Sequence, residues 1–334
     1  HSADGSVLER IGFYGELELA EYSERQVMPH ERTLAGPKAD RLKLLTAARA
    51  NLSSVFLLYE DPTDAATKVL ESAFGSGGET LGSATDDAGV QYTLARLTDA
   101  DALAELHDFM QERSCVIADG HHRYETALEY RRTKRAEVDV ASGVAPFDST
   151  LAYFANAYSS GSLLLPVHRV IRQQPRPSRQ QWQAGLPGWT REVVACGGEA
   201  SEVAAQAMEL LASHADEAAF VADAGDGELE LFVRGEPLGE TLLVQLIEEE
   251  VIGGVFGLSA EEIRDGRVHF PKSAERAARD VREGSGQTAL YLNGLKPEDV
   301  FRVTRAGEVM PQKSTFFYPK IPTGMVFRLH EVEG

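Results

Sequence analysis

Two histidines and an arginine directly follow a tight turn in the segment Asp119-Gly120-His121-His122-Arg123. The apolar residues before the turn predict a short buried strand, and the spacing of the residues after it predicts a helix over His122–Arg135. The free N–H groups and the positive end of the helix dipole favour an anion at such a helix start. Gly120 lets the backbone approach a ligand, and Arg123 can form paired hydrogen bonds with phosphate oxygens. We therefore expect a phosphate site here. The alternative is a helix-capping turn with solvated histidines.

A second polar segment, Met28–Thr33, carries His30, Glu31 and Arg32 in a row. A carboxylate can accept a hydroxyl proton if its pocket raises its pKa, so Glu31 is a candidate general base. It is also a candidate metal ligand, with His30 and Arg32 directed toward phosphate. The alternative is an exposed polar loop before a helix.

A third segment, Met310–Lys320, places a lysine and two hydroxyls side by side at Lys313, Ser314 and Thr315. The spacing is not that of a P-loop, because the two glycines of that motif are absent. Its aromatic residues are expected in the core, and Lys313 is kept as a candidate catalytic residue, with the two hydroxyls as binding residues.

His168 and Arg169 lie in the middle of an apolar run that predicts a strand over Leu163–Ile171. Because side chains alternate along a strand, only one of the two can face a shared pocket. Both are candidate binding residues, and a purely structural role for the histidine is equally compatible with the pattern.

Length, charge and cysteine content limit the classes of protein to which the chain can belong. The chain has 334 residues, which suggests about two domains, and a net charge of −19, which disfavours binding to nucleic acid or anionic lipid. It contains no apolar run of the ~18 residues that would span a membrane. Its two cysteines, Cys115 and Cys196, form no disulfide framework, which fits a reducing cytoplasm.

Predicted strands and helices alternate without a fixed repeat, so we expect an α+β (mixed α/β) fold. The stretch Ala136–Asp148 is the best candidate for a connector. We therefore expect a phosphate-binding region over residues 1–147 and a C-terminal α/β region over residues 148–334 that folds back on the site.

The turn Asp119-Gly-His-His-Arg-Tyr124 resembles the phosphate-binding turn of the ParB/sulfiredoxin superfamily, whose members carry Gly-x-x-Arg or Gly-Cys-His-Arg before a helix. More closely, the chain resembles an uncharacterised bacterial family, domain of unknown function 1015. Three segments carry that resemblance, namely Val27–Thr33, Ala118–Tyr124 and Met310–Lys320, and Leu165–Arg169 supports it. Family members usually have further sequence before the point where this chain begins, so we expect an N-terminal part to be missing.

The resemblance implies a ParB/sulfiredoxin-like nucleotide-binding core. It implies that His121, His122 and Arg123 contact the phosphates of ATP or ADP, with Asp119 near a magnesium ion. By similarity to the free-serine kinases of the superfamily, Glu31 is expected to act as the base. Sulfiredoxins carry a reactive cysteine within the turn, where this chain has histidine, which disfavours sulfinic-acid reduction.

We therefore expect a cytoplasmic, Mg²⁺-dependent phosphotransferase that acts on a small hydroxyl-bearing metabolite, with Glu31, His122 and Lys313 as its catalytic residues. One alternative is a non-catalytic nucleotide-dependent switch of the ParB type. Another is a metal-dependent hydrolase with Asp119, His121, His122 and His30 as ligands. The oligomeric state stays open.

Overall fold

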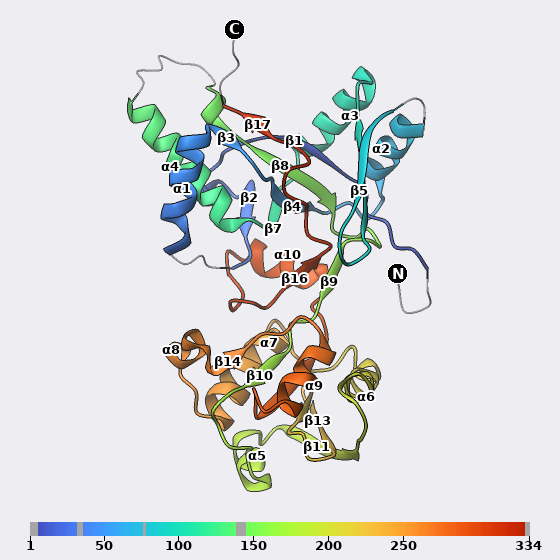
Figure 1. Cartoon of the computed structure of the whole chain (residues 1–334), viewed down its shortest axis with the longest axis vertical. Coiled ribbons are helices and arrows are strands. Elements are labelled where there is room, and N and C mark those ends of the chain that lie inside the picture. The colour runs from blue at the N-terminus through green and yellow to red at the C-terminus, as the bar shows by residue number, and fades with distance from the viewer. Residues whose placement is uncertain (1–5, 32–35, 76–77, 138–144, 331–334) are drawn as a thin grey trace. The chain divides into compact units, whose positions relative to one another are not determined.

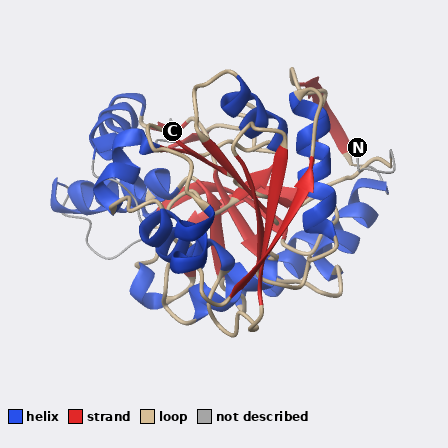
Figure 2. Ribbon diagram, turned by 90° about the horizontal axis from the view of Figure 1, so that it is seen from below, coloured by secondary structure: helices blue, strands red, loops and turns tan. Residues whose placement is uncertain are grey.

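The computed structural model describes residues 6–31, 36–75, 78–137 and 145–330. The chain divides into two compact units, each built from both strands and helices (Figure 1). Figure 2 shows the strands and helices of the chain in separate colours. The first comprises His1–Leu163, Val300–Val309 and Phe317–Gly334, and the second comprises Leu164–Asp299 and Met310–Phe316. The expected mixed α/β class is confirmed.

The first unit is organised around a five-stranded mixed sheet in the order β1-β8-β4-β7-β2. The elements in its N-terminal part are β1 (Gly12–Glu18), η1 (Tyr22–Glu24), β2 (Val27–Pro29), α1 (Gly36–Ala48), β3 (Ala50–Asn51), β4 (Val55–Tyr59), α2 (Ala65–Gly75), β5 (Glu79–Thr85), β6 (Gln91–Arg96), α3 (Ala100–Gln111), β7 (Cys115–Asp119), α4 (His121–Glu137), η2 (Pro146–Asp148) and β8 (Ser149–Asn156). Three later elements join them, most of α10 (Pro297–Arg305), most of β16 (Phe316–Tyr318) and all of β17 (Arg328–Leu329).

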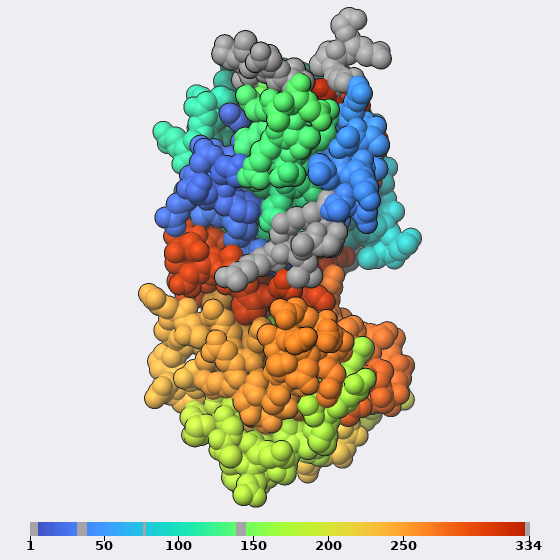
Figure 3. Space-filling view, turned by 90° about the vertical axis from the view of Figure 1, so that its left-hand side faces the viewer, coloured from blue at the N-terminus to red at the C-terminus, as the bar shows by residue number. Residues whose placement is uncertain are grey.

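The central strands of this sheet are apolar on both faces, which explains why they lie in the middle. All five residues of β4, Val55–Tyr59, are buried. Helix α4 packs beside α1 (Figure 3, green and blue) and buries Tyr124, Ala127 and Leu128 in the core with the strands. The Tyr124 hydroxyl donates to the carbonyl of Ala20 at 2.7 Å and accepts from its N–H at 3.1 Å, which fixes the start of α4.

The second unit is organised around a six-stranded sheet in the order β11-β13-β12-β15-β10-β14. Its elements are β10 (Arg169–Ile171), α5 (Arg179–Gly185), β11 (Trp189–Ala195), α6 (Ala200–Ala212), β12 (Ala219–Asp223), β13 (Glu228–Arg234), α7 (Leu243–Leu246), η3 (Ile247–Val255), α8 (Ala260–Glu262), η4 (Ile263–Arg267), β14 (Val268–His269), α9 (Ala274–Arg282) and β15 (Thr288–Leu292). Helices α6 and α9 pack together, and Trp182 lies in an aromatic cluster with Phe220, Phe232 and Phe256.

Two expectations about organisation need correction. The boundary expected after residue 147 falls inside the first unit, because β8 pairs with both β1 and β4 in its sheet. Residues 138–144 of the expected connector lie outside the described residues. The strand expected over Leu163–Ile171 is two short strands, β9 (Leu163–Leu165) and β10, on either side of Pro166. A proline has no N–H to donate to a ladder, which interrupts a strand.

A helix that spans a bilayer needs about 20 apolar residues. No helix in the described part of the chain meets that requirement.

Candidate functional site

Strands β2 and β7 bring two separate polar segments to one edge of the first sheet. The strands run parallel, with Val27 opposite Cys115 and Pro29 opposite Ile117. Parallel strands end at the same edge, so the residues that follow each strand meet there. His30 and Glu31 follow β2, and the turn at Gly120 follows β7. The sheet register therefore explains why two segments about 90 residues apart in sequence form one site.

The predicted strand-turn-helix junction is confirmed. Strand β7 ends at Asp119, Gly120 has a φ of +96°, and α4 begins at His121, one residue earlier than expected. A φ this positive is accessible to glycine and strained for other residues. The Tyr124 N–H donates to the Gly120 carbonyl at 3.0 Å and closes the first turn of the helix.

His30 is buried and has a defined tautomer. Its Nδ1 lies 2.6 Å from the Ile117 carbonyl oxygen, which can only accept, so Nδ1 carries the proton and Nε2 carries the lone pair. The ring packs edge-on against those of His121 and Phe317, at centroid distances of 4.6 and 5.6 Å. Burial lowers the pKa of His30 to about 4, outweighing the bond to Ile117, which raises it.

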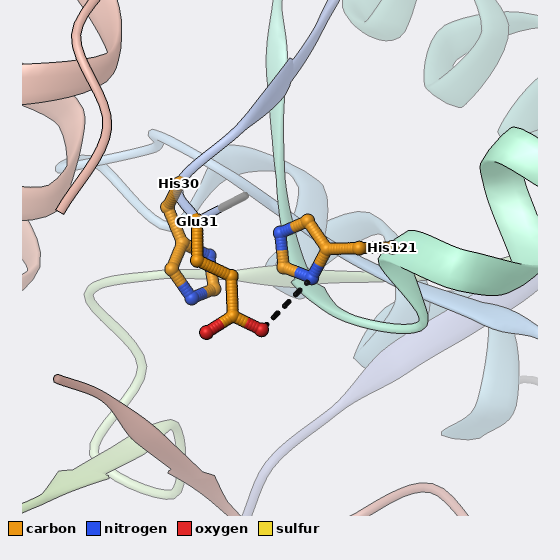
Figure 4. A group of neighbouring side chains, drawn as sticks. All are labelled: His30, Glu31 and His121. Carbon is orange, nitrogen blue, oxygen red and sulfur yellow. Dashed lines mark ion pairs between the residues drawn. The ribbon is translucent and has the colours of Figure 1, made fainter. Parts of the chain in front are cut away.

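His121 and Glu31 face each other across the same edge (Figure 4). The Nδ1 of His121 lies 3.6 Å from Oε1 of Glu31. Burial, and next the neighbouring His30, lower the pKa of His121 to about 2. The imidazole is therefore neutral at neutral pH, so this contact is not an ion pair, and 3.6 Å is too long for a hydrogen bond.

The three side chains of His30, Glu31 and His121 form a compact group. Each offers a nitrogen or carboxylate oxygen, and these atoms lie within 4.8 Å of one another. Two neutral imidazoles and one carboxylate are a ligand set for a divalent transition metal ion. The Nε2 atom of His121 is buried and has no hydrogen-bond partner among the described residues.

Asp119, expected to lie near magnesium, has a cation on each carboxylate oxygen. Its Oδ1 accepts from Nζ of Lys320 at 2.8 Å, and its Oδ2 accepts from Nη2 of Arg123 at 2.6 Å. Burial alone would raise the pKa of Asp119, but Lys320 and Arg123 outweigh it and hold the pKa below its usual range. Arg123 also donates to Oγ of Ser53 at 3.2 Å. The carboxylate therefore orients two cations beside the turn.

Lys320 is a site residue that the sequence pattern did not reveal. It closes the segment Met310–Lys320, in which Lys313 is the candidate predicted from the sequence. Lys313 lies in the second unit, is exposed, and has its Nζ 4.9 Å from the ring centroid of Phe270. The predicted convergence of Lys313 with Glu31 and His122 therefore stays a prediction.

The remaining candidates have varied surroundings. His122 is half-buried in the first turn of α4, outside the group of His30, Glu31 and His121. Arg32 lies outside the described residues. Ser314, in the second unit, is buried and its hydroxyl donates to the Pro311 carbonyl at 2.7 Å, whereas Thr315 is half-buried.

His168 and Arg169 are both buried within the second unit. The expectation that only one of them faces a shared pocket stays a prediction. Nδ1 of His168 accepts from the Leu292 N–H at 3.2 Å. Arg169 donates to the Val167 carbonyl, and its guanidinium lies 5.5 Å from the ring centroid of Phe270. These contacts are compatible with the structural alternative stated for His168, and a role of either residue in cofactor binding stays a prediction.

The first unit thus has a mixed α/β fold with a polar, histidine-containing site at one edge of its sheet. The sequence matches the model of the family described as Protein of unknown function (DUF1015) over residues 2–225, and the chain belongs to that family. The matched range includes Glu31 and the Gly120 turn, whereas Lys320 lies beyond it. The expected membership is confirmed, and the wider relationship to ParB and sulfiredoxin stays a prediction.

Several solved structures are similar over most of their length. A free serine kinase in complex with AMP is 12% identical, with a TM-score of 0.43 and coverage of 95% of this chain and 90% of that chain. A conserved hypothetical protein from Pyrococcus furiosus is 13% identical, with a TM-score of 0.43 and coverage of 95% of both chains. SbnI from Staphylococcus aureus, with a C-terminal truncation, is 11% identical, with a TM-score of 0.45 and coverage of 95% and 87%. Likenesses at this level do not establish a shared function. No curated protein matches the sequence.

Proposed function

We propose that the first unit binds a nucleotide and transfers a phosphoryl group to a small hydroxyl-bearing metabolite, as a serine kinase does. The observation that carries this proposal is the position of the Glu31 carboxylate beside the glycine turn that begins α4. An anion-binding helix start and a candidate proton acceptor are then adjacent. Both are needed when a hydroxyl attacks a phosphate group.

The turn has the features of a phosphate-binding site. Helix α4 is 17 residues long, and the first N–H groups of a helix have no acceptor within it. The guanidinium of Arg123 lies directly over Gly120, so that a Cβ atom at Gly120 would come within 2.7 Å of Nε of Arg123. The absence of a side chain at Gly120 therefore makes room for the arginine beside the helix start. Nε of Arg123 is buried and has no partner among the described residues, which leaves one donor for a ligand.

Glu31 is the proposed general base. A third of its side chain is exposed, so a small hydroxyl can approach it. The imidazole of His121 beside it is neutral at neutral pH and so adds no positive charge next to the carboxylate. His122, in the same helical turn as His121, and Lys313 keep the catalytic roles proposed from the sequence.

The N–H groups and cations around the turn would suit the phosphates of a nucleotide that carries a magnesium ion. When bound, ATP or ADP would supply the phosphoryl group and Mg²⁺ would neutralise phosphate charge. The N–H groups of α4 and Arg123 would hold the phosphates, and Lys320 adds a cation beside them. Asp119 orients Arg123 and Lys320, which gives it a positioning role besides its proposed contact with Mg²⁺.

The substitution Glu31→Gln tests the proposal, because it keeps the shape of the side chain and removes the basic oxygen. We expect kcat for phosphate transfer from ATP or ADP to a hydroxyl metabolite, starting with serine, to fall roughly 10²–10⁴-fold. Nucleotide affinity, measured by thermal shift with and without Mg²⁺, should stay within a few fold. Glu129→Gln, an exposed position on α4, is the matched control and should leave both values unchanged.

Equal turnover in Glu31→Gln and the wild type would remove Glu31 from the mechanism. The substitution Arg123→Ala should abolish the nucleotide-induced thermal shift, and unchanged binding would contradict the phosphate site. Tight nucleotide binding without turnover by the wild type would favour the non-catalytic switch.

A further inference from the structure

The acceptance of a proton by Glu31 does not by itself require the two buried histidines beside it. His30 is 3% exposed and His121 is 4% exposed. Buried histidines are commonly held by hydrogen bonds on both nitrogens, but Nε2 of His121 has no partner among the described residues. The contact of His121 with Glu31 is not a hydrogen bond either, because its atoms are 3.6 Å apart. Hydrogen bonds to the described residues therefore do not hold Nε2 of His121 in place.

The spacing matches that of ligands that share one metal ion. Two ligands bound at about 2.1 Å to a tetrahedral ion lie roughly 3.4 Å apart. The 3.6 Å between Nδ1 of His121 and Oε1 of Glu31 is close to that value. All three candidate ligand atoms lie within 4.8 Å of one another, so small side-chain rotations would complete the site.

The tautomer of His30 also suits a ligand. Its Nδ1 hydrogen is directed to the Ile117 carbonyl at 2.6 Å, so its lone pair lies on Nε2. A hydrogen bond from the second ring nitrogen to a backbone carbonyl is the usual way in which proteins orient a metal-binding histidine. Since Ile117 belongs to β7, the same sheet positions the orienting group and, through the turn, His121.

We propose that His30, Glu31 and His121 bind one divalent transition metal ion, with Zn²⁺ as the best fit. Two imidazoles with one carboxylate suit Zn²⁺, whereas Mg²⁺ prefers oxygen ligands alone. Three protein ligands leave one position of a tetrahedral ion for water or a substrate, as in catalytic rather than structural zinc sites. This ion is distinct from the magnesium that would accompany a nucleotide.

The binding of Zn²⁺ does not depend on the proposed phosphotransferase activity. The effect of bound Zn²⁺ on catalysis does depend on it. A carboxylate that ligates a metal ion cannot also accept a proton from a hydroxyl. If Glu31 is the base, occupancy of this site should therefore inhibit phosphate transfer, and that consequence rests on the proposed function.

The test is calorimetric titration of ZnCl₂ into protein treated with a chelator, without nucleotide and without a histidine tag. We expect one tight site per chain, with affinity at least roughly tenfold weaker in Glu31→Gln and in His121→Gln. His214→Gln is the matched control. His214 forms an exposed pair with Glu217, so it represents a surface site that binds zinc adventitiously.

Because His121 is buried, the melting temperature of each variant without metal must show that it is folded. Glu31 is partly exposed, so Glu31→Gln keeps the test decisive if His121→Gln does not fold. Unchanged zinc affinity in folded Glu31→Gln, absence of tight binding by the wild type, or loss of binding in His214→Gln would each overturn the proposal. None of these results depends on phosphate transfer, so this proposal and the proposed function can fail separately.

Discussion

Burial keeps both imidazoles of the site neutral at neutral pH. The pKa of His30 is lowered to about 4 and that of His121 to about 2, against 6.5 for an ordinary histidine. In the unfolded chain both side chains return to the ordinary value. The unfolded state therefore binds more protons than the folded state whenever the pH is below 6.5.

We predict that the protein loses stability as the pH falls from 6.5 toward 5. A folded-state pKa below the unfolded one means that the stabilisation is complete above 6.5 and decreases below it. Each such histidine contributes a slope of up to about 1.4 kcal/mol per pH unit once the unfolded chain is protonated. Urea unfolding at several pH values measures the slope.

In the variant His121→Gln, the slope of stability against pH should be smaller by the contribution of one histidine, which is up to about 1.4 kcal/mol per pH unit. His107→Gln, at an exposed position on α3, is the control and should leave the slope unchanged. If His121→Gln and the wild type lose stability equally with falling pH, the imidazole of His121 is not kept neutral by burial.

The two adjacent histidines illustrate what the sequence could predict at single positions. The types and spacing of residues indicated a polar site at the turn, but not that His121 is buried while His122 is half-buried. That difference depends on the orientation of α4 against the sheet, which is set by Tyr124 and its bonds to Ala20. One of the two partners of Asp119 could not be predicted either, because Lys320 is 201 residues away in sequence.

At the scale of elements, the junction between β7 and α4 depends on Gly120. We predict that Gly120→Ala and Gly89→Ala each destabilise the protein by about 1–2 kcal/mol, because both positions have a positive φ. Only Gly120→Ala should also weaken nucleotide binding, because the new Cβ would displace the guanidinium of Arg123 from Asp119. A Cβ at Gly89 would meet no heavy atom of the described residues within 4 Å, which makes this position the matched control.

Urea unfolding gives the two stability changes, and calorimetric titration of ADP gives the binding change. Equal ADP affinity in both variants would show that the position of Arg123 over Gly120 does not matter for binding. A much larger loss of stability in Gly120→Ala would show that the guanidinium cannot move aside.

Local elements were predictable where short-range signals agreed. An apolar run followed by Asp-Gly indicated a strand and a turn, and β7 and α4 confirm that prediction. The helical segment Leu243–Val255 is harder to predict from such signals. It begins as α7 and continues as the π-helix η3, whose longer hydrogen-bond step is not signalled by apolar periodicity.

At the scale of the molecule, the path of the chain was beyond prediction from local patterns. Strand β8 follows the expected boundary but lies between β1 and β4, so the first unit extends to Leu163. The unit also takes in Val300–Val309 and Phe317–Gly334. Such long-range pairings depend on complementary surfaces, whereas the sequence pattern reports mainly on neighbours.

The last segment of the first unit should contribute to its stability. Phe317 is 2% exposed and contacts the ring of His30, so we predict that Phe317→Ala costs about 3–5 kcal/mol. Hydrogen exchange measured on peptides from β7 and α4 should accelerate. Phe327→Ala, in the same segment but 56% exposed, is the control and should leave exchange unchanged. Equal exchange in the two variants would contradict the packing of Phe317 against this site.

The return of the chain to the first unit has a consequence for synthesis on the ribosome. Translation proceeds from the N-terminus, so Glu31, His30 and the Gly120 turn emerge long before Phe317 and Lys320. Until then the nascent chain lacks the aromatic ring that covers His30 and one of the two cations that hold Asp119. The whole continuous part of the second unit, Leu164–Asp299, is made in that interval. The candidate site is thus completed only after Leu164–Asp299 and Phe317 have been made, and a chain that terminates before Phe317 would expose an incomplete candidate site to chaperones and proteases.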